Sequence, residues 1–307
     1  MNPTKSDALP DFHPSTVIRD WGEGQALRIE DALTGISVFG ATGSGKSSGP
    51  GRNIAMGYLA ADFGGLVLCS KPEERHVWEG WARECGREQD LVIVDKSGRW
   101  RFNVLDWEAS RSGEGAGMTT NIVALLKEIA HAVKGTESKG GGGDSKFFDD
   151  ALEHMEGNLV ELILFSGLRL SLGLMRDIVL SGPQNLDEAH SEAWREQSVC
   201  AAVLREAAAN AERLDADMQS DFEECRAYWE VEFPSTSFKT RSIFTLMFSM
   251  LTRNFTTRPL SKLFSSDTNV TPEMMFNGRI FIINLPVQEF KLCWDACESS
   301  VEILLSD

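Results

Sequence analysis

The sequence predicts an α/β fold built on a parallel sheet, with an all-α domain inserted into it. A glycine-rich phosphate-binding loop at 40–48 follows the apolar run 36–39 directly. Two more apolar runs, 66–69 and 91–95, come after helix-like segments, and strands that alternate with helices typically form parallel sheets covered on both faces. From 147 to about 252 the pattern is almost wholly helical, which predicts a separate helical domain.

Composition and charge restrict the class of protein. The chain has 307 residues, 42% of them hydrophobic and 25% charged, which is enough for one large domain or two modest ones. No run of about 18 apolar residues occurs and the N-terminus is polar, so we expect no membrane span, no signal peptide and a cytoplasmic location. The formal net charge of −16 argues against nucleic-acid binding over the whole surface, so any DNA contact must be local.

Six cysteines are spread along the chain. The only close pair, Cys293 and Cys297, has no histidine or second cysteine pair near it to complete a zinc site. We therefore interpret the cysteines as reduced thiols in the core.

The phosphate-binding loop has the spacing Gly40-x4-Gly45-Lys46-Ser47. Its glycines allow backbone N–H groups to surround a phosphate chain, Lys46 would reach the β and γ phosphates, and the Ser47 hydroxyl would bind Mg²⁺. The alternative is a glycine-rich turn that carries Lys-Ser by chance. We predict ATP and Mg²⁺ as cofactors, with a binding set of Gly40, Ala41, Thr42, Gly43, Ser44, Gly45, Lys46, Ser47 and Ser48.

The helix after the loop, expected over 53–60, begins irregularly. Gly49, Pro50 and Gly51 occupy what should be its first turns. Because proline has no N–H and is tolerated only at early helical positions, we expect the helix to start late or to bend.

Short elements complete the first part of the fold. Strands are expected over 17–21 and 26–29, joined by the turn 22–24 and flanking the nucleotide pocket. A further helix is expected to open at Lys71 and to end near Gly86.

Trp78 and Trp81 lie three residues apart on this helix. Such a pair can form a recognition stripe, but aromatic residues at helical spacing usually pack in a core. We interpret them as packing residues.

The inserted domain is expected to follow a polar, glycine-rich segment at 106–117, with a first helix over 122–133. The segment 134–146 contains four consecutive glycines and reads as a flexible connector. The last clear helix has a predicted buried face of Ile243, Phe244, Met247, Met250 and Leu251. A strand over 279–285 then returns to the sheet, and 286–305 is expected to be helical.

Charge divides this helical stretch into two parts. Between Asp187 and Glu232 there are 13 acidic and four basic residues, which indicates a solvated acidic face. The segment 237–262 has no acidic residue, and its cations are a candidate DNA surface: Lys239, Arg241, Arg253, Arg258 and Lys262. The alternative is that these five cations pair with the acidic helices.

The segment 99–102, Arg-Trp-Arg-Phe, interleaves basic and aromatic residues. This pattern can stack on single-stranded bases, and it equally suits a half-buried strand. We favour the strand.

A P-loop hydrolase also needs carboxylates at the end of a neighbouring strand, to hold Mg²⁺ and to orient the attacking water. Asp95 ends a suitable apolar run, but Lys96 follows where a catalytic acid is expected. The strand at 279–285 offers only Asn284 at the corresponding place.

Several motifs together suggest a family: the loop 40–47, Lys71-Pro-Glu-Glu74, Val94-Asp95 followed by Phe102-Asn103-Val-Leu105, Phe147-Phe148-x2-Ala151, and the strand within 278–286. They resemble the TraG/TraD-like conjugative coupling ATPases of type IV secretion systems, relatives of the FtsK and HerA DNA pumps. The resemblance covers most of the chain.

The resemblance implies a RecA-like P-loop NTPase with a parallel central sheet, interrupted by an all-α domain. The nucleotide-binding domain would comprise 1–107 and 263–307, with the inserted domain at 108–262. Family members usually form homo-hexamers that use ATP to move single-stranded DNA, or relaxase–DNA complexes, to secretion-channel proteins. The membrane helices common in the family are not seen here, which leaves peripheral attachment at the inner membrane face open.

In the family, the Mg²⁺-binding aspartate and the catalytic glutamate lie on a strand after the one that matches 279–285. This chain ends before such a strand, so we expect an N-terminal part of a longer protein that hydrolyses ATP poorly. Lys46 is then the catalytic residue, with Asp95 as a candidate carboxylate.

Two other functions stay open. A non-catalytic nucleotide-binding or assembly module would use the P-loop to order a subunit interface. A small-molecule phosphotransferase fits less well, because the helical insertion is large and no acceptor-site motif is present.

Overall fold

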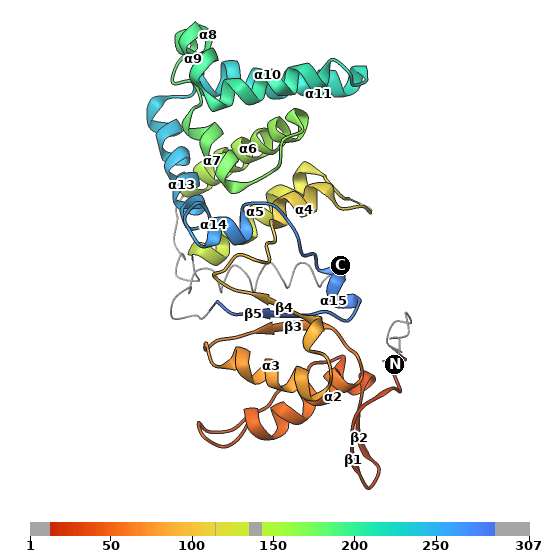
Figure 1. The fold of residues 1–307 in the computed structure, drawn as a ribbon. Coiled ribbons are helices and arrows are strands. Elements are labelled where there is room, and N and C mark those ends of the chain that lie inside the picture. Colours follow the sequence, from red (N-terminus) through yellow and green to blue (C-terminus); the bar gives the residue numbers. More distant parts are fainter. Residues whose placement is uncertain (1–12, 114, 135–142, 286–307) are drawn as a thin grey trace. The chain divides into compact units, whose positions relative to one another are not determined.

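The computed structural model describes residues 13–113, 115–134 and 143–285 (Figure 1). These residues form a mixed α/β protein that is mostly helical, with a small parallel sheet of three strands. No helix in the described part of the chain is both long and apolar enough to cross a membrane.

The chain divides into two compact units. The described residues of the first unit are 13–100 and 270–285, and those of the second are 101–269. The second unit therefore interrupts the first; its described residues run from 101 to 269, whereas the sequence predicts an inserted domain at 108–262.

A β-hairpin opens the first unit, as expected. Strand β1 (Val17–Gly22) pairs antiparallel with β2 (Gln25–Arg28), and the short helix α1 (Ile29–Ala32) follows. Gly22, Glu23 and Gly24 all have positive φ between the strands, a conformation that glycine adopts without steric cost. The predicted turn at 22–24 is thus confirmed.

The parallel sheet has the order β3-β5-β4. Strands β3 (Gly65–Leu68) and β4 (Leu91–Val94) come before the helical unit, and β5 (Ile280–Ile283) comes after it and pairs with both. All four residues of β5, Ile-Phe-Ile-Ile, are buried, which is typical of a central parallel strand. The three predicted strands are confirmed, and the one most distant in sequence lies in the middle.

Two helices pack on one face of this sheet: α2 (Arg52–Ala60) and α3 (Glu74–Glu84) (Figure 1). The expected helical cover on both faces is thus not found among the described elements of this unit. The ring centroids of Trp78 and Trp81 lie 5.1 Å apart in an edge-to-face arrangement. Both side chains pack against the core cluster that includes Ile280 and Ile282 of β5. Their interpretation as packing residues is confirmed.

Two short elements lead into the outer and central strands. The 3₁₀ turn η2 (Glu88–Asp90) precedes β4, and the helix α15 (Glu273–Phe276) precedes β5.

The predicted strand at 36–39 is wrong for the described structure. These residues have no regular secondary structure, and Phe39 is 90% exposed. A strand needs a neighbour to accept and donate its ladder hydrogen bonds, and no described strand pairs with this segment.

The second unit is all-helical in its described residues (Figure 1). Its elements are α4 (Val104–Ser110), α5 (Thr119–Lys134), α6 (Gly143–Ser166), α7 (Leu172–Leu180), α8 (Leu186–His190), α9 (Glu192–Gln197), α10 (Val199–Ala211), α11 (Ala216–Ala227), the π turn η3 (Tyr228–Glu232), α12 (Phe233–Ser235), α13 (Phe238–Thr256) and α14 (Leu260–Phe264).

Helix α6 is the centre of this unit and packs against α5, α10, α11 and α13. Its residues Met155, Leu159 and Leu162 are fully buried in one continuous apolar core. Several of the surrounding helices begin with a side-chain oxygen that accepts from the first turn, which satisfies an N–H that has no partner within the helix: Asn103, Ser171, Asn185, Ser191, Ser198, Asp215 and Ser237.

Three expectations about this unit need correction. The polar segment 106–117 begins with a helix, α4, because the Asn103 side chain caps its first turn. The segment 99–102 is not a strand, because its backbone bonds go to Leu263 of α14 and to the irregular residue Asn269 and not to another strand. The Arg101 guanidinium forms a bidentate ion pair with Asp267. Met250 is not buried but 64% exposed.

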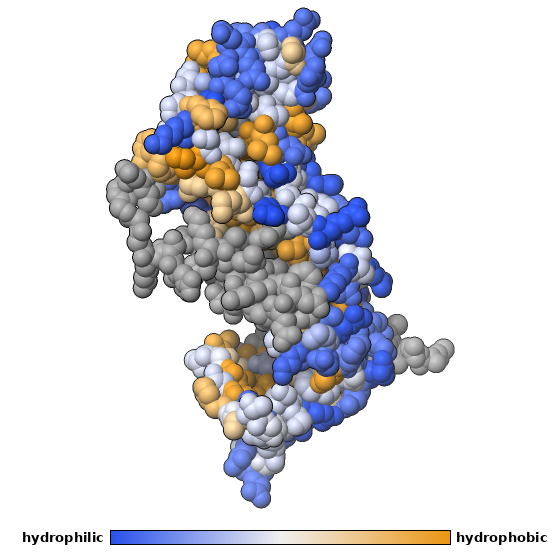
Figure 2. Space-filling model, turned by 90° about the vertical axis from the view of Figure 1, so that its left-hand side faces the viewer, coloured by the Kyte–Doolittle hydropathy of each residue, from blue (hydrophilic) through white to orange (hydrophobic). Residues whose placement is uncertain are grey.

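Figure 2 views the molecule from the side on which α13 lies and shows apolar side chains at the surface of the helical unit. Leu246 and Met250 of α13 are among the exposed large apolar residues.

The predicted connector lies largely outside the described residues, as do the predicted helix at 286–305 and the cysteine pair Cys293 and Cys297. The four described cysteines, Cys69, Cys85, Cys200 and Cys225, are free thiols.

Candidate functional site

The loop at 40–48 lies in the first unit, between the segment 36–39 and the helical turns that lead into α2. Gly43 and Gly45 have φ of 79° and 83°, so both positions favour glycine. A Cβ on Gly40 would lie 2.5 Å from Ser44 Oγ and 3.2 Å from Lys46 Cγ, so a side chain at this position would require these two side chains to move. The backbone conformation therefore favours glycine at Gly43 and Gly45, and Gly40 packs closely against the side chains of Ser44 and Lys46.

Lys46 folds back over this loop. Its Nζ donates to the carbonyl oxygens of Gly40 at 2.6 Å and Ala41 at 2.9 Å. A phosphate group would compete with these two neutral acceptors for the ammonium, and a charged acceptor binds it more strongly. The lysine thus lies beside the loop that a phosphate would occupy.

The turns after Lys46 are irregular, as the glycines and the proline predict. The π turn η1 (Ser47–Gly51) contains Pro50, and the Gly51 N–H donates to Lys46 O at 2.8 Å. Regular helix begins only at Arg52. Ser47, the predicted Mg²⁺ ligand, is exposed on this turn, and the late helix start is confirmed.

Asp95 follows β4 at the carboxyl edge of the sheet, where ligands bind in open α/β folds. Its carboxylate accepts from Arg75 Nη1 at 2.9 Å and from the Ser97 N–H at 3.0 Å. A magnesium ion would have to compete with the Arg75 guanidinium for Oδ2 of Asp95. Asp95 is therefore engaged in structure.

Asn284 lies at the same edge, directly after β5. Its N–H donates to Val94 O at 2.9 Å and continues the ladder, while its Oδ1 is buried without a hydrogen-bond partner. In the described residues, no group of three or more histidine, cysteine or acidic side chains is arranged to hold a metal ion.

The five cations proposed for DNA contact do not share one environment. Lys239, Arg253, Arg258 and Lys262 are exposed on or after α13. Within the described residues, no carboxylate lies within 4.0 Å of the charged groups of Lys239, Arg253 and Arg258, so pairing with the acidic helices does not account for these three.

Arg241 is a correction, because it is only 3% exposed. Its guanidinium donates to the carbonyl oxygens of Phe233, Pro234, Thr236 and Gln184 and lies over the Phe233 ring. It binds the end of α12 and the turn before α8, and it is removed from the candidate DNA surface.

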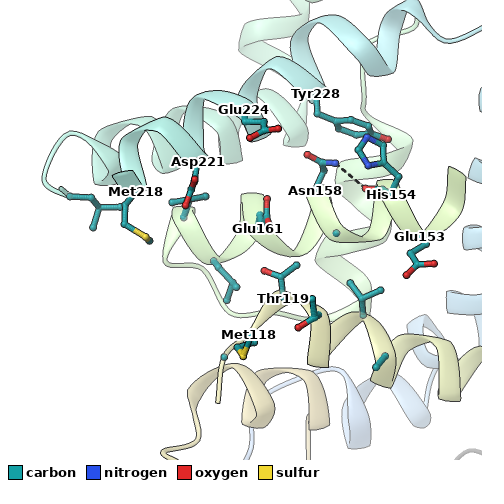
Figure 3. Close-up of a pocket in the computed structure, with 18 of the residues that line it drawn as sticks. Met118, Thr119, Glu153, His154, Asn158, Glu161, Met218, Asp221, Glu224 and Tyr228 are labelled. Carbon is teal, nitrogen blue, oxygen red and sulfur yellow. Dashed lines mark hydrogen bonds between the residues drawn. The ribbon is translucent and has the colours of Figure 1, made fainter. Parts of the chain in front are cut away.

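The helical unit contains a large trough that the sequence patterns did not single out (Figure 3). Its volume is about 1280 Å³, and side chains from α5, α6 and α11 line it. Each helix contributes one polar or apolar stripe that looks ordinary by itself, so only their packing reveals the trough.

The chain was compared with known proteins, and no family model, no curated protein and no solved structure matches it.

Proposed function

We propose that this chain binds ATP with Mg²⁺ through the loop at 40–48 and is a motor subunit of the conjugative coupling type. The observation that carries the proposal is the loop itself. Two glycines with positive φ, a glycine packed closely against the side chains of Ser44 and Lys46, and a lysine folded over the loop carbonyls coincide with the phosphate-binding spacing.

The order of the elements supports the finer part of the proposal. An all-helical unit interrupts the chain between β4 and β5, and β5 then enters the middle of the parallel sheet. A RecA-like domain with an all-α insertion would have this order, as the motif resemblance implies. Movement of single-stranded DNA or of relaxase–DNA complexes, hexamer formation and docking to a secretion channel extend the same proposal.

ATP with Mg²⁺ is expected to stabilise the first unit against unfolding. At a ligand concentration one hundred times the dissociation constant, the gain is about 2.7 kcal/mol, because only the folded loop binds nucleotide. Thermal unfolding with and without ATP–Mg²⁺ measures it, and Lys46→Ala should remove most of the gain. Lys239→Ala, which changes an exposed lysine of the other unit, is the matched control. No shift with ATP, or the same shift in Lys46→Ala, contradicts the proposal.

A second function, a nucleotide-dependent assembly module that moves nothing, is favoured by the environment of Asp95. Its carboxylate is bound by Arg75 and the Ser97 N–H, so the described sheet edge presents no free aspartate to a metal. Binding of single-stranded DNA separates the two functions.

If the motor proposal holds, Arg253→Ala combined with Arg258→Ala weakens binding of single-stranded DNA. Loss of two phosphate contacts should make the negative slope of log affinity against log salt shallower by about 1.4. Fluorescence anisotropy with a labelled oligonucleotide over a salt series measures this slope. Arg195→Ala with Arg213→Ala should leave it unchanged, since Arg195 is exposed on α9 and Arg213 is exposed in the turn between α10 and α11. No binding, or equal slopes in both double variants, favours the assembly module.

A further inference from the structure

The trough in the helical unit has the shape of a groove that could hold one more helix. Its walls are α5 and α11 and its base is α6, and Figure 3 shows residues of all three directed into it. The lining residues of α6 run from Glu153 to Phe165, which corresponds to roughly 18 Å of helix at about 1.5 Å per residue. A guest helix of about three turns would span this length.

Gly157 keeps the middle of the trough open. It lies within the long helix α6, where glycine costs stability because it increases the freedom of the unfolded chain. A Cβ built on Gly157 meets nothing within 4 Å, so close packing does not explain the glycine. The absent side chain instead adds to the empty space along the base.

The charge of the trough is negative at its centre. Two of its carboxylates have a basic side chain beside them: Glu153 lies 2.5 Å from Lys127 Nζ and Glu232 lies 3.6 Å from His154 Nε2. Three others, Glu161, Asp221 and Glu224, have no ion pair in the described part of the chain.

Figure 3 shows these three carboxylates facing one another from α6 and α11. Burial, and next the charges of Asp221 and Glu224, raise the pKa of the Glu161 carboxyl above its ordinary value. The repulsion among the three groups would fall if a cation entered between them.

Apolar surface accompanies these charges. Val123 of α5, Leu164 and Phe165 of α6 and Leu214 before α11 also line the trough. A small polyamine would satisfy the carboxylates but leave this apolar surface in water, and a nucleic acid would bring phosphates next to three carboxylates. A guest with cations and apolar groups on one face satisfies both.

We propose that this trough binds a basic amphipathic helix of a partner protein, with its Lys or Arg side chains between Glu161, Asp221 and Glu224. The partner helix would pack beside α5, α6 and α11 as a fourth helix. Its apolar contacts to α5 and α6 would determine how deeply it enters the trough. The trough lies wholly within the second unit, so this inference stands independently of nucleotide binding at the loop.

The test uses a labelled synthetic peptide with the sequence LKKLLKLLKKLLKL and its glutamate counterpart LEELLELLEELLEL. Fluorescence anisotropy with the 307-residue chain is expected to show saturable binding of the lysine peptide and at least tenfold weaker binding of the glutamate peptide. The triple variant Glu161→Gln, Asp221→Asn, Glu224→Gln should lose at least tenfold in affinity for the lysine peptide.

Two matched controls separate the trough from the general acidity of the chain. Glu192→Gln, Glu196→Gln and Glu206→Gln together remove the same formal charge from exposed positions outside the trough and should change affinity less than twofold. Gly157→Phe should abolish peptide binding by filling the trough, whereas Gly157→Ala should retain it, with circular dichroism reporting the fold of each.

The proposal is overturned if both triple variants weaken binding equally, because the attraction is then general. It is also overturned if spermine displaces the peptide at equal concentration, because a small polycation site then explains the charges. Should Gly157→Phe not fold, the comparison of the two triple variants decides the matter alone.

Discussion

Replacing Arg87 by methionine is expected to lower the free energy of unfolding of the first unit by about 3–5 kcal/mol, the usual cost of removing one partner from a buried ion pair. Arg87 is 3% exposed and pairs with the buried Asp90 at 2.5 Å. It also donates to the carbonyl oxygens of Leu59, Phe63 and Gly278, so one guanidinium joins the end of α2, the turn before β3 and the turn before β5.

Denaturant unfolding followed by tryptophan fluorescence measures this loss. Arg83→Met is the matched control, because Arg83 is exposed, pairs with Glu88 at 2.8 Å and should cost at most about 1 kcal/mol. Adding Asp90→Leu to Arg87→Met should recover part of the loss, since the buried carboxylate that has lost its nearest cation, and keeps Arg279 at 3.8 Å, is then gone. Equal losses for Arg83→Met and Arg87→Met would contradict this account.

Arg87 illustrates what local sequence patterns do and do not contain. The strands at 66–69, 91–95 and 279–285 and the phosphate-binding spacing are predictable, because each depends on residues close together in the chain. The position of β5 between β3 and β4 is not, since it depends on which strands pair across the length of the helical unit. The Arg87 contact to Gly278, 191 residues away, has no sequence signal at all.

The errors have physical causes of the same kind. The apolar run 36–39 has strand propensity, but propensity gives no strand without a partner to pair with. The trough combines stripes from α5, α6 and α11 that are each ordinary amphipathic faces. A sequence pattern reports which face of a helix is apolar, and it does not report whether a neighbour fills the space beside that face.

Arg241 shows how a composition argument can misplace a functional residue. Counting cations over 237–262 treats the five as equivalent, although a helix turns successive side chains to different sides. Arg241 points inward from α13 and donates to four carbonyl oxygens at or near the end of α12 and before α8. Arg253, on the same helix, is exposed.

Arg241→Met is accordingly expected to lower the free energy of unfolding of the helical unit by about 2–3 kcal/mol, because buried carbonyl oxygens lose their donor and the end of a helix loses a favourable cation. Arg253→Met, the matched control on α13, should change it by less than about 0.5 kcal/mol. Calorimetry of both variants beside Arg87→Met assigns each change to its unit if the two units unfold in separate transitions. If Arg241→Met left stability unchanged and weakened binding of single-stranded DNA, the side chain would contact DNA after all. Loss of stability without a change in the salt slope of DNA binding places Arg241 in the fold and leaves Arg253 and Arg258 as the cations to test.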